Sequence, residues 1–109
     1  MLKQLYRLPK SAKVLHAESI HTPFVSIKKA QNGLSHSRFA FVVSKKVDKR
    51  AVVRNKVKRT LRSFIEYNIE NIVKGYDMIL IAKAQIQTIT KEALFDSLRN
   101  TFKNKNSLI

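Results

Sequence analysis

One long segment of the chain shows helical spacing on two separate faces. Between Ala51 and Val73, apolar residues recur three and four positions apart, namely Val53, Val57, Leu61, Phe64, Ile65 and Ile72. This spacing predicts an amphipathic helix over about 51–73 whose apolar stripe is buried. The pair Lys74-Gly75 suits its end, because a cation favours the last carbonyls and glycine accepts a left-handed cap. Such a helix needs a partner layer, so the fold must place it on a sheet or on other helices.

The polar face of this segment is almost entirely cationic. Residues 45–62 contain one acid, Asp48, against nine cations: Lys45, Lys46, Lys49, Arg50, Arg54, Lys56, Lys58, Arg59 and Arg62. Four polar residues fall at i, i+3, i+4 and i+7 and form one helical stripe: Asn55, Lys58, Arg59 and Arg62. A solvated helix face usually mixes signs, because like charges one turn apart weaken the helix. The pattern therefore favours phosphate binding over an ordinary solvated surface.

The composition of the whole chain points the same way. Its 109 residues include 22 Lys and Arg against 7 Asp and Glu, a net charge of +15, which is typical of proteins that bind a polyanion. The length and the 44% hydrophobic content predict one packed domain over residues 1–109, and the charge predicts that it is an RNA-binding domain. The absence of cysteine excludes a disulfide framework and a cysteine zinc site.

No segment predicts a signal peptide or a helix that spans a membrane. The first residues lack the apolar core of a signal peptide, and the runs Phe39–Val43 and Met78–Ala82 are too short to cross a bilayer. We therefore expect a cytoplasmic protein with no membrane partner and no small-molecule substrate.

The other segments predict strands and further helices. Phe24–Ala30 and Arg38–Ser44 have strand composition, and Asn32-Gly33 between them suits a tight reversal. We expect the two strands to form an antiparallel hairpin. The second strand is apolar at nearly every position, which is typical of a central strand buried on both faces.

Tyr76–Ala82 predicts a third strand, and Thr88 or Thr90 then caps a helix that runs through about Phe102. A short helix is expected from about Ser11 to Ala17, and residues 104–109 are expected to fray. The fold class is α+β, a small sheet with helices packed on it.

Catalytic and metal-binding patterns are missing. His16, His21 and His36 show no ligand spacing, so surface histidines are the simpler interpretation. Glu66 and Glu70 could hold a metal, but with Lys74 they read more simply as a ladder of ion pairs along a helix. We predict no catalytic and no metal-binding residue in the chain.

Several motifs together resemble a known family. Val43-Ser44-Lys45-Lys46-Val47 and the segment Ala51–Arg62 resemble the signature of the protein subunit of bacterial ribonuclease P. The family's mark is an Arg-Asn-Arg core followed by Lys-Arg and one further Arg. Arg7-Leu8 and Tyr76–Lys83 also resemble the family, so the likeness spans about residues 7–103.

This resemblance implies a fold and a function. The fold would have a four-stranded sheet in α-β-β-β-α-β-α order with a left-handed crossover at the long helix. The RNA subunit would carry out the chemistry with Mg²⁺, removing the 5′ leader from precursor tRNA. The protein would bind ribonuclease P RNA and steady the leader between the sheet and the first helix. Seven residues match the RNA-binding motif by position, namely Lys45, Lys46, Arg54, Asn55, Lys58, Arg59 and Arg62; Arg50 and Lys56 join them as neighbouring cations.

The chain departs from the family pattern at several positions. Lys56 replaces the second Arg of the core, which keeps the charge but not bidentate phosphate geometry. Ala40 stands where glycine is usual, and the stretch between Leu8 and Phe24 is about a helical turn shorter. The aromatic pair of the first helix has no counterpart, which leaves Phe24 and Ile27 as the candidate leader contacts.

Two other functions fit the charge and the size. A ribosomal or ribosome-assembly protein would bind RNA without any role in cleavage. A membrane-surface protein would use the basic amphipathic helix, but a domain this small needs the apolar stripe of that helix for its core.

Overall fold

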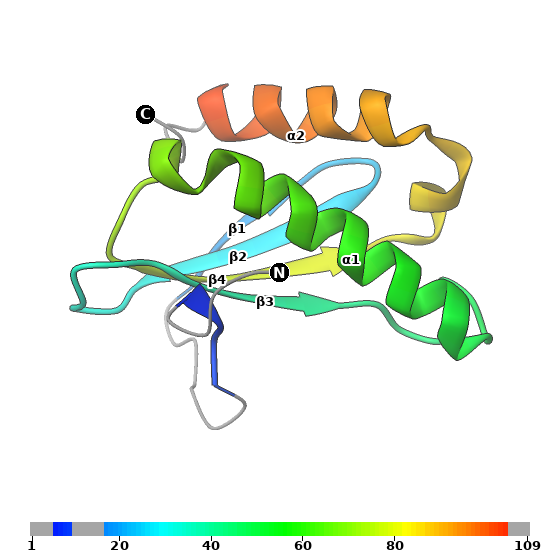
Figure 1. The fold of residues 1–109 in the computed structure, drawn as a ribbon, viewed down its shortest axis with the longest axis horizontal. Helices are drawn as coiled ribbons and strands as arrows, with labels where there is room; N and C mark the ends of the chain where they lie inside the picture. Colours follow the sequence, from blue (N-terminus) through cyan, green and yellow to red (C-terminus); the bar gives the residue numbers. More distant parts are fainter. Residues whose placement is uncertain (1–5, 10–16, 105–109) are drawn as a thin grey trace.

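Two helices cover one face of a four-stranded sheet (Figure 1). The structure, a computed structural model, describes residues 6–9 and 17–104. Its elements in chain order are β1 Glu18–His21, β2 Val25–Gln31, β3 Arg38–Val42, α1 Ala51–Asn68, the 3₁₀ helix η2 Ile69–Asn71, β4 Tyr76–Ala82, the 3₁₀ helix η3 Ala84–Thr88 and α2 Lys91–Asn104. The predicted α+β class is confirmed.

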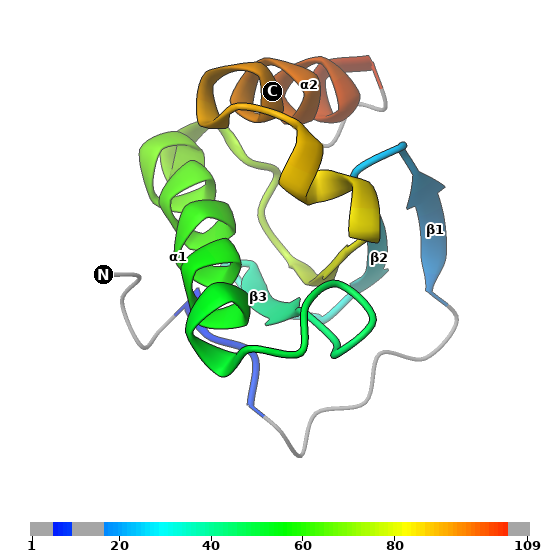
Figure 2. The same ribbon diagram turned by 90° about the vertical axis from the view of Figure 1, so that its right-hand side faces the viewer.

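The strand order is β1-β2-β4-β3, which places β4 inside the sheet. β2 pairs antiparallel with β1 and with β4, whereas β3 lies parallel to β4. Helix α1 connects these two parallel strands. In Figure 2 the strands β3 and β4 point toward the viewer, α1 lies on the left beside β3, and β4, in yellow, lies on the other side of β3 from α1. The crossover is therefore left-handed, as the resemblance implies.

The predicted hairpin between the segments that form β2 and β3 is wrong. The turn itself exists, since Gly33 has φ +72° and the amide of Leu34 donates to Oδ1 of Asn32 at 2.7 Å. The strands that it joins diverge, however, and β4 inserts between them. Asn32 also donates to Oδ1 of Asp77 in β4, at 2.9 Å, so the turn is tied to the inserted strand.

The core lies between the sheet and the two helices. Alternate residues of each strand point toward the helices, and Ile27, Phe39, Met78 and Leu80 among them are almost fully buried. Leu61, Phe64 and Ile65 of α1 pack onto this layer. The ring of Phe64 lies 5.4 Å from that of Phe95 and 5.6 Å from that of Phe102, which joins α1 to α2.

The opposite face of the sheet is covered by no helix or strand among the described residues. It carries exposed Lys28 and Val42 together with half-buried Ala40, Ile79 and Ile81. The prediction that β3 is a central strand buried on both faces is therefore wrong. Val42 remains 43% exposed, and β3 is an edge strand, whereas β2 and β4 are the inner strands.

The helix boundaries confirm some predictions and correct others. Helix α1 ends at Asn68, five residues before Val73, and Ile72 has extended backbone. Gly75 has φ +87°, but it turns the chain into β4 instead of capping α1. Of the two predicted caps of α2, Thr88 and Thr90, the structure shows Thr90. Its Oγ1 accepts a hydrogen bond from the amide of Ala93 at 3.2 Å.

Near the start of the chain, the local sequence pattern does not predict β1, which the structure shows. Most of the helix predicted from about Ser11 to Ala17, and the tail after Asn104, lie outside the described residues.

Candidate nucleic-acid interface

The four residues of the predicted helical stripe lie together on the surface of α1. Asn55, Lys58, Arg59 and Arg62 line one shallow depression, which Val52 completes. The sequence interpretation missed Val52, although it lies three residues before Asn55 and so on the same helix face. Its side chain is 76% exposed, which leaves apolar surface among the cations. We call this set of five residues the α1 stripe.

The core fixes the direction in which the α1 stripe points. Leu61, Phe64 and Ile65 have no exposed surface, so the rotation of α1 about its axis is set by their packing against the sheet. Residues on a different arc of the helix must then face outward. The stripe is therefore held on a rigid element and not on a loop.

Arg62 is positioned by an aromatic ring of the sheet. Its guanidinium carbon lies 5.8 Å from the centre of the Phe41 ring in β3. Such a cation–π contact orients the guanidinium group while leaving its N–H groups free to donate elsewhere. Arg62 and Arg59 also line a second depression farther along α1, together with Ser63 and Glu66.

Arg50 and Arg54 hold the chain that leads into α1. The Arg50 guanidinium donates to both carboxylate oxygens of Asp48, at 3.0 and 2.9 Å. The Arg54 guanidinium donates to the carbonyls of Asp48 and Lys49, at 3.1 and 2.7 Å. The hydrogen bonds from Arg50 lower the pKa of Asp48 to about 2. These two arginines therefore shape the entry to the helix as well as adding charge.

The start of α1 has no acidic or capping group of its own. No side chain caps the helix at Arg50, and its first turn contains no acid. Helix N-termini carry partial positive charge and free N–H groups. The local field therefore adds to that of the cations and favours an anion.

The other predicted cations lie around the α1 stripe. Lys45 and Lys46 are exposed in the turn before α1. Lys56 is exposed on another side of the helix, where it lines a groove between α1 and α2 with Arg50 and Lys91. The structure thus brings four predicted residues into one depression, whereas the other five lie before α1, at its first turns or on another side of the helix.

The predicted leader contacts are not on the open face of the sheet. Ile27 points toward the helices and has no exposed surface, so it cannot contact a leader strand, and its assignment is wrong. Phe24 is half-buried and packs against the core beside the turn between β1 and β2. Buried and accessible residues alternate along β2, and this alternation places Val25 and Ile27 on the side of the sheet that faces the core.

Asp77 in β4 binds residues of β3 and of the turn after β2. The Arg38 guanidinium donates to both oxygens of Asp77, at 2.9 and 2.8 Å. Burial alone would raise the pKa of Asp77, but the hydrogen bonds from Arg38 and Asn32 outweigh it and lower the pKa. In the part of the chain that the structure describes, no three His, Asp or Glu residues are grouped to hold a metal ion. None of the described helices is both long and apolar enough to cross a membrane.

Comparisons with known proteins agree with this geometry. A family model described as Ribonuclease P matches residues 4–106. The ribonuclease P protein component of Fusobacterium nucleatum is 40% identical over 78 residues, which cover 68% of this chain and 69% of that protein. The protein component of Histophilus somni is 33% identical over 90 residues, covering 83% and 75%.

Solved structures show the same fold. The RNase P protein of Staphylococcus aureus superposes with a TM-score of 0.83 at 27% identity, covering 95% of this chain and 98% of that one. The RNase P protein of Thermotoga maritima gives a TM-score of 0.79 at 25% identity, covering 90% and 96%.

Proposed function

The chain belongs to the ribonuclease P protein family, the protein components of an endoribonuclease, and on this premise we propose how its surfaces divide the work. The α1 stripe binds the core of ribonuclease P RNA. The open face of the sheet steadies the 5′ leader of precursor tRNA. The protein acts in the cytoplasm as the non-catalytic partner of the RNA.

One observation carries the first part of the proposal. Lys58, Arg59 and Arg62 converge on one depression of a helix whose rotation the core fixes. Three cations held at helical spacing can meet successive phosphates of a structured RNA without reorganisation. The cation–π contact between Arg62 and Phe41 adds to this preparation.

The RNA subunit is the proposed site of the chemistry, with Mg²⁺ bound mainly by RNA. The α1 stripe supports this division, because Lys and Arg side chains stay protonated at neutral pH and offer no general base. Their contribution is to neutralise phosphate charge, which favours the folded RNA and its complex with substrate.

The open face of the sheet is the proposed surface for the leader. Val42 is 43% exposed there, beside exposed Lys28 and half-buried Ile81. A single strand that lies on such a surface can rest its bases on aliphatic side chains while Lys28 attracts a phosphate. This also accounts for the apolar outer side of β3, which the core does not require.

No observation favours the ribosomal alternative or the membrane-surface alternative. The apolar side of α1 is occupied by the core, as Leu61 and Phe64 show, so it is not available to a lipid surface.

The salt dependence of binding tests the role of the phosphates. Affinity for labelled ribonuclease P RNA is measured between low and moderate salt. If about five phosphates are contacted, the logarithm of the binding constant should fall with the logarithm of the salt concentration with a slope of about −3.5 or steeper. Arg59→Ala should make the slope shallower by roughly one contact. A slope near zero for the unmodified chain would contradict phosphate binding by the α1 stripe.

A further inference from the structure

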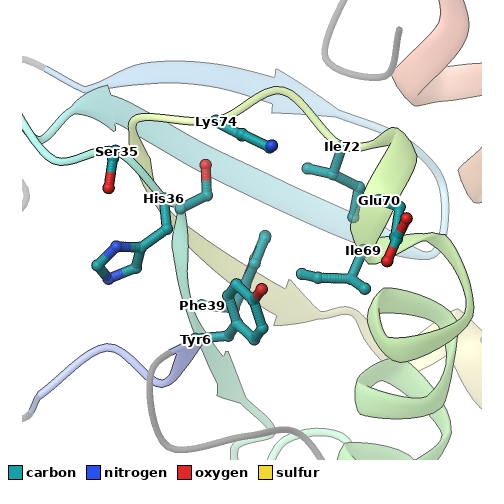
Figure 3. Close-up of a pocket in the computed structure, with 9 residues that line it drawn as sticks. Tyr6, Ser35, His36, Phe39, Ile69, Glu70, Ile72 and Lys74 are labelled. Atoms are coloured by element: carbon teal, nitrogen blue, oxygen red, sulfur yellow. The ribbon is translucent and has the colours of Figure 1, made fainter.

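The side of α1 that carries the stripe leads to a pocket at the far end of the helix. This pocket has a volume of about 260 Å³. It is lined by residues from the N-terminal segment, β3 with the turn before it, and the chain after α1, namely Tyr6, Ser35, His36, Ser37, Phe39, Ile69, Glu70, Ile72 and Lys74 (Figure 3). We call it the η2 pocket, because Ile69 and Glu70 belong to η2.

The α1 stripe and the η2 pocket follow one another along the chain. Arg59, Arg62 and Glu66 are three and four residues apart, which is the spacing of one face of α1. The helix then ends at Asn68, and Glu70 follows in η2. The two depressions on α1 share Arg59 and Arg62, and the second one ends at Glu66, one turn before Glu70. From Arg59 to the end of α1 at Asn68 the rise is roughly 14 Å at 1.5 Å per residue, and the pocket begins at the next residue, Ile69. A few nucleotides of single-stranded RNA can span this distance.

The charge of this surface reverses along its length. The cations Arg59 and Arg62 come first, and the acids Glu66 and Glu70 follow. The last carbonyls of α1 add partial negative charge at this end. The far end therefore disfavours phosphate and favours a group that is rich in hydrogen-bond donors.

The walls of the η2 pocket suit a planar ring. The Tyr6 and His36 rings lie with centroids 6.3 Å apart at 78°, forming an aromatic corner. Ile69 and Ile72 lie across from this corner (Figure 3). Unpaired RNA bases are recognised by stacking on such rings and by hydrogen bonds to their edges.

Hydrogen bonds hold the walls of the pocket in place. Ser37 Oγ donates to the carbonyl of Val73 at 2.6 Å and accepts the amide of Tyr76 at 3.0 Å, which joins β3 to the chain after α1. The amide of Leu8 donates to the carbonyl of Phe39 at 2.8 Å, which fixes the segment next to Tyr6. A pocket built in advance costs less to fill than one that must first become ordered.

We propose that the η2 pocket takes one unpaired guanine of the RNA bound along α1, read by the carboxylate of Glu70. The inference rests on the proposed function, since the α1 stripe must bring the strand to the pocket. The Watson–Crick edge of guanine presents two adjacent donors, N1–H and the 2-amino group, and a carboxylate offers two acceptor oxygens. Uracil presents one donor between two carbonyls, which a carboxylate repels. Lys74 also lines the pocket, and its ammonium group offsets the acids there and offers a partner for the phosphate of the same nucleotide.

Short oligonucleotides test the pocket separately from the phosphate contacts. The full chain is titrated with labelled hexauridylate and with the same hexamer carrying one guanosine at its 5′ or its 3′ end. One of the two guanosine hexamers, the one whose strand direction brings its guanosine to the pocket, should bind about tenfold more tightly than hexauridylate. The same hexamer with inosine, which lacks the 2-amino group, should bind about threefold more tightly than hexauridylate. Equal affinity for all hexamers would overturn the proposal.

Matched variants separate base recognition from charge. Glu70→Gln replaces one acceptor oxygen with a donor, and Tyr6→Leu removes the ring but keeps apolar bulk, so both should abolish the preference for guanosine. Glu92→Gln removes the same charge at an exposed position of α2 and should leave the preference intact. If guanosine is still preferred after Glu70→Gln, Glu70 does not read the base.

Failure of the proposed function would look different. Arg59→Ala should weaken binding of every hexamer and keep the ratio between guanosine and uridine. Steeply salt-dependent binding without base preference would overturn the η2 pocket alone. Binding that does not depend on salt would contradict the α1 stripe as well.

Discussion

At the scale of single residues, cations that lie close in sequence do different work. Arg54 donates to two backbone carbonyls before α1, and Arg50 is held by Asp48. Arg59 and Arg62 instead border an open depression, where their N–H groups can meet a ligand. A count of positive charges cannot separate these roles, because the difference arises from where each guanidinium finds its acceptor.

Substitutions on the two faces of α1 should separate binding from folding. Arg59→Ala or Arg62→Ala should weaken binding of ribonuclease P RNA about tenfold. The cost in stability should be small, because Arg59 is exposed and half-buried Arg62 gives up only a cation–π contact with Phe41. Leu61→Ala should leave a cavity in the core and lower the free energy of unfolding by about 2–5 kcal/mol. Urea unfolding together with RNA titration of each variant checks both effects. An unfolded Arg59→Ala variant with intact RNA affinity would mean that the faces are reversed.

The contact between Asp48 and Arg50 should appear in the acid stability of the protein. Since folding lowers the pKa of Asp48 from 3.8 to about 2, the carboxylate stabilises the fold above about pH 4, and this contribution is lost as the pH falls toward 2. Asp48→Asn should lower the melting temperature clearly at pH 7 and only slightly at pH 2. The measurement is the melting temperature of both proteins from pH 7 to pH 2. An equal difference at every pH would show that the carboxylate charge is not responsible.

At the scale of elements, the local sequence pattern predicted where helices and strands lie in the chain better than it predicted which strands pair in the sheet. The apolar spacing of α1 and the Thr90 cap come from contacts within a few residues, and both are visible in the sequence. The pairing of β2 with β4 joins residues about 50 positions apart, such as Ile27 and Leu80, and no local rule specifies it. The apolar run of β3 also misled, because Val42 faces an open surface and not a second core layer.

The turn between η2 and β4 should depend on Gly75 more than the turn after β2 depends on Gly33. Both glycines have positive φ, which costs other residues about 1–2 kcal/mol. A Cβ at position 75 would also lie 3.3 Å from the carbonyl oxygen of Leu34, whereas one at position 33 would meet nothing. Gly75→Ala should therefore lower the urea midpoint more than Gly33→Ala does. Equal losses would show that the close approach to Leu34 is relieved without cost.

At the scale of the whole molecule, the fold separates the two surfaces that we propose to bind RNA. Both helices lie on one side of the sheet (Figure 1), and the opposite side carries Val42, Ile79 and Ile81. A protein built in this way can contact the RNA subunit with α1 and the substrate with the sheet. The left-handed crossover contributes by placing α1 above β3, where Arg62 reaches Phe41.

Two exposed valines test this separation. Val52→Asp puts a negative charge in the α1 stripe and should weaken binding of the RNA subunit about tenfold. Val42→Asp puts the same charge on the open face and should weaken binding of precursor tRNA by the assembled enzyme, while leaving affinity for the RNA subunit unchanged. Equilibrium titrations with each RNA measure both. If the two variants lose the same partner, the proposed division of surfaces is wrong.

The most direct test of the central claim is a cleavage gel with three lanes. The protein alone, a bacterial ribonuclease P RNA alone and the two together are incubated with precursor tRNA at near-physiological Mg²⁺. If the RNA subunit carries out the chemistry, we expect no cleavage by the protein alone, poor cleavage by the RNA alone, and release of the 5′ leader when both are present. Cleavage by the protein alone that is lost on mutating Glu66 or Glu70 would contradict the RNA-based chemistry, and no gain from adding protein would contradict its role as the protein component.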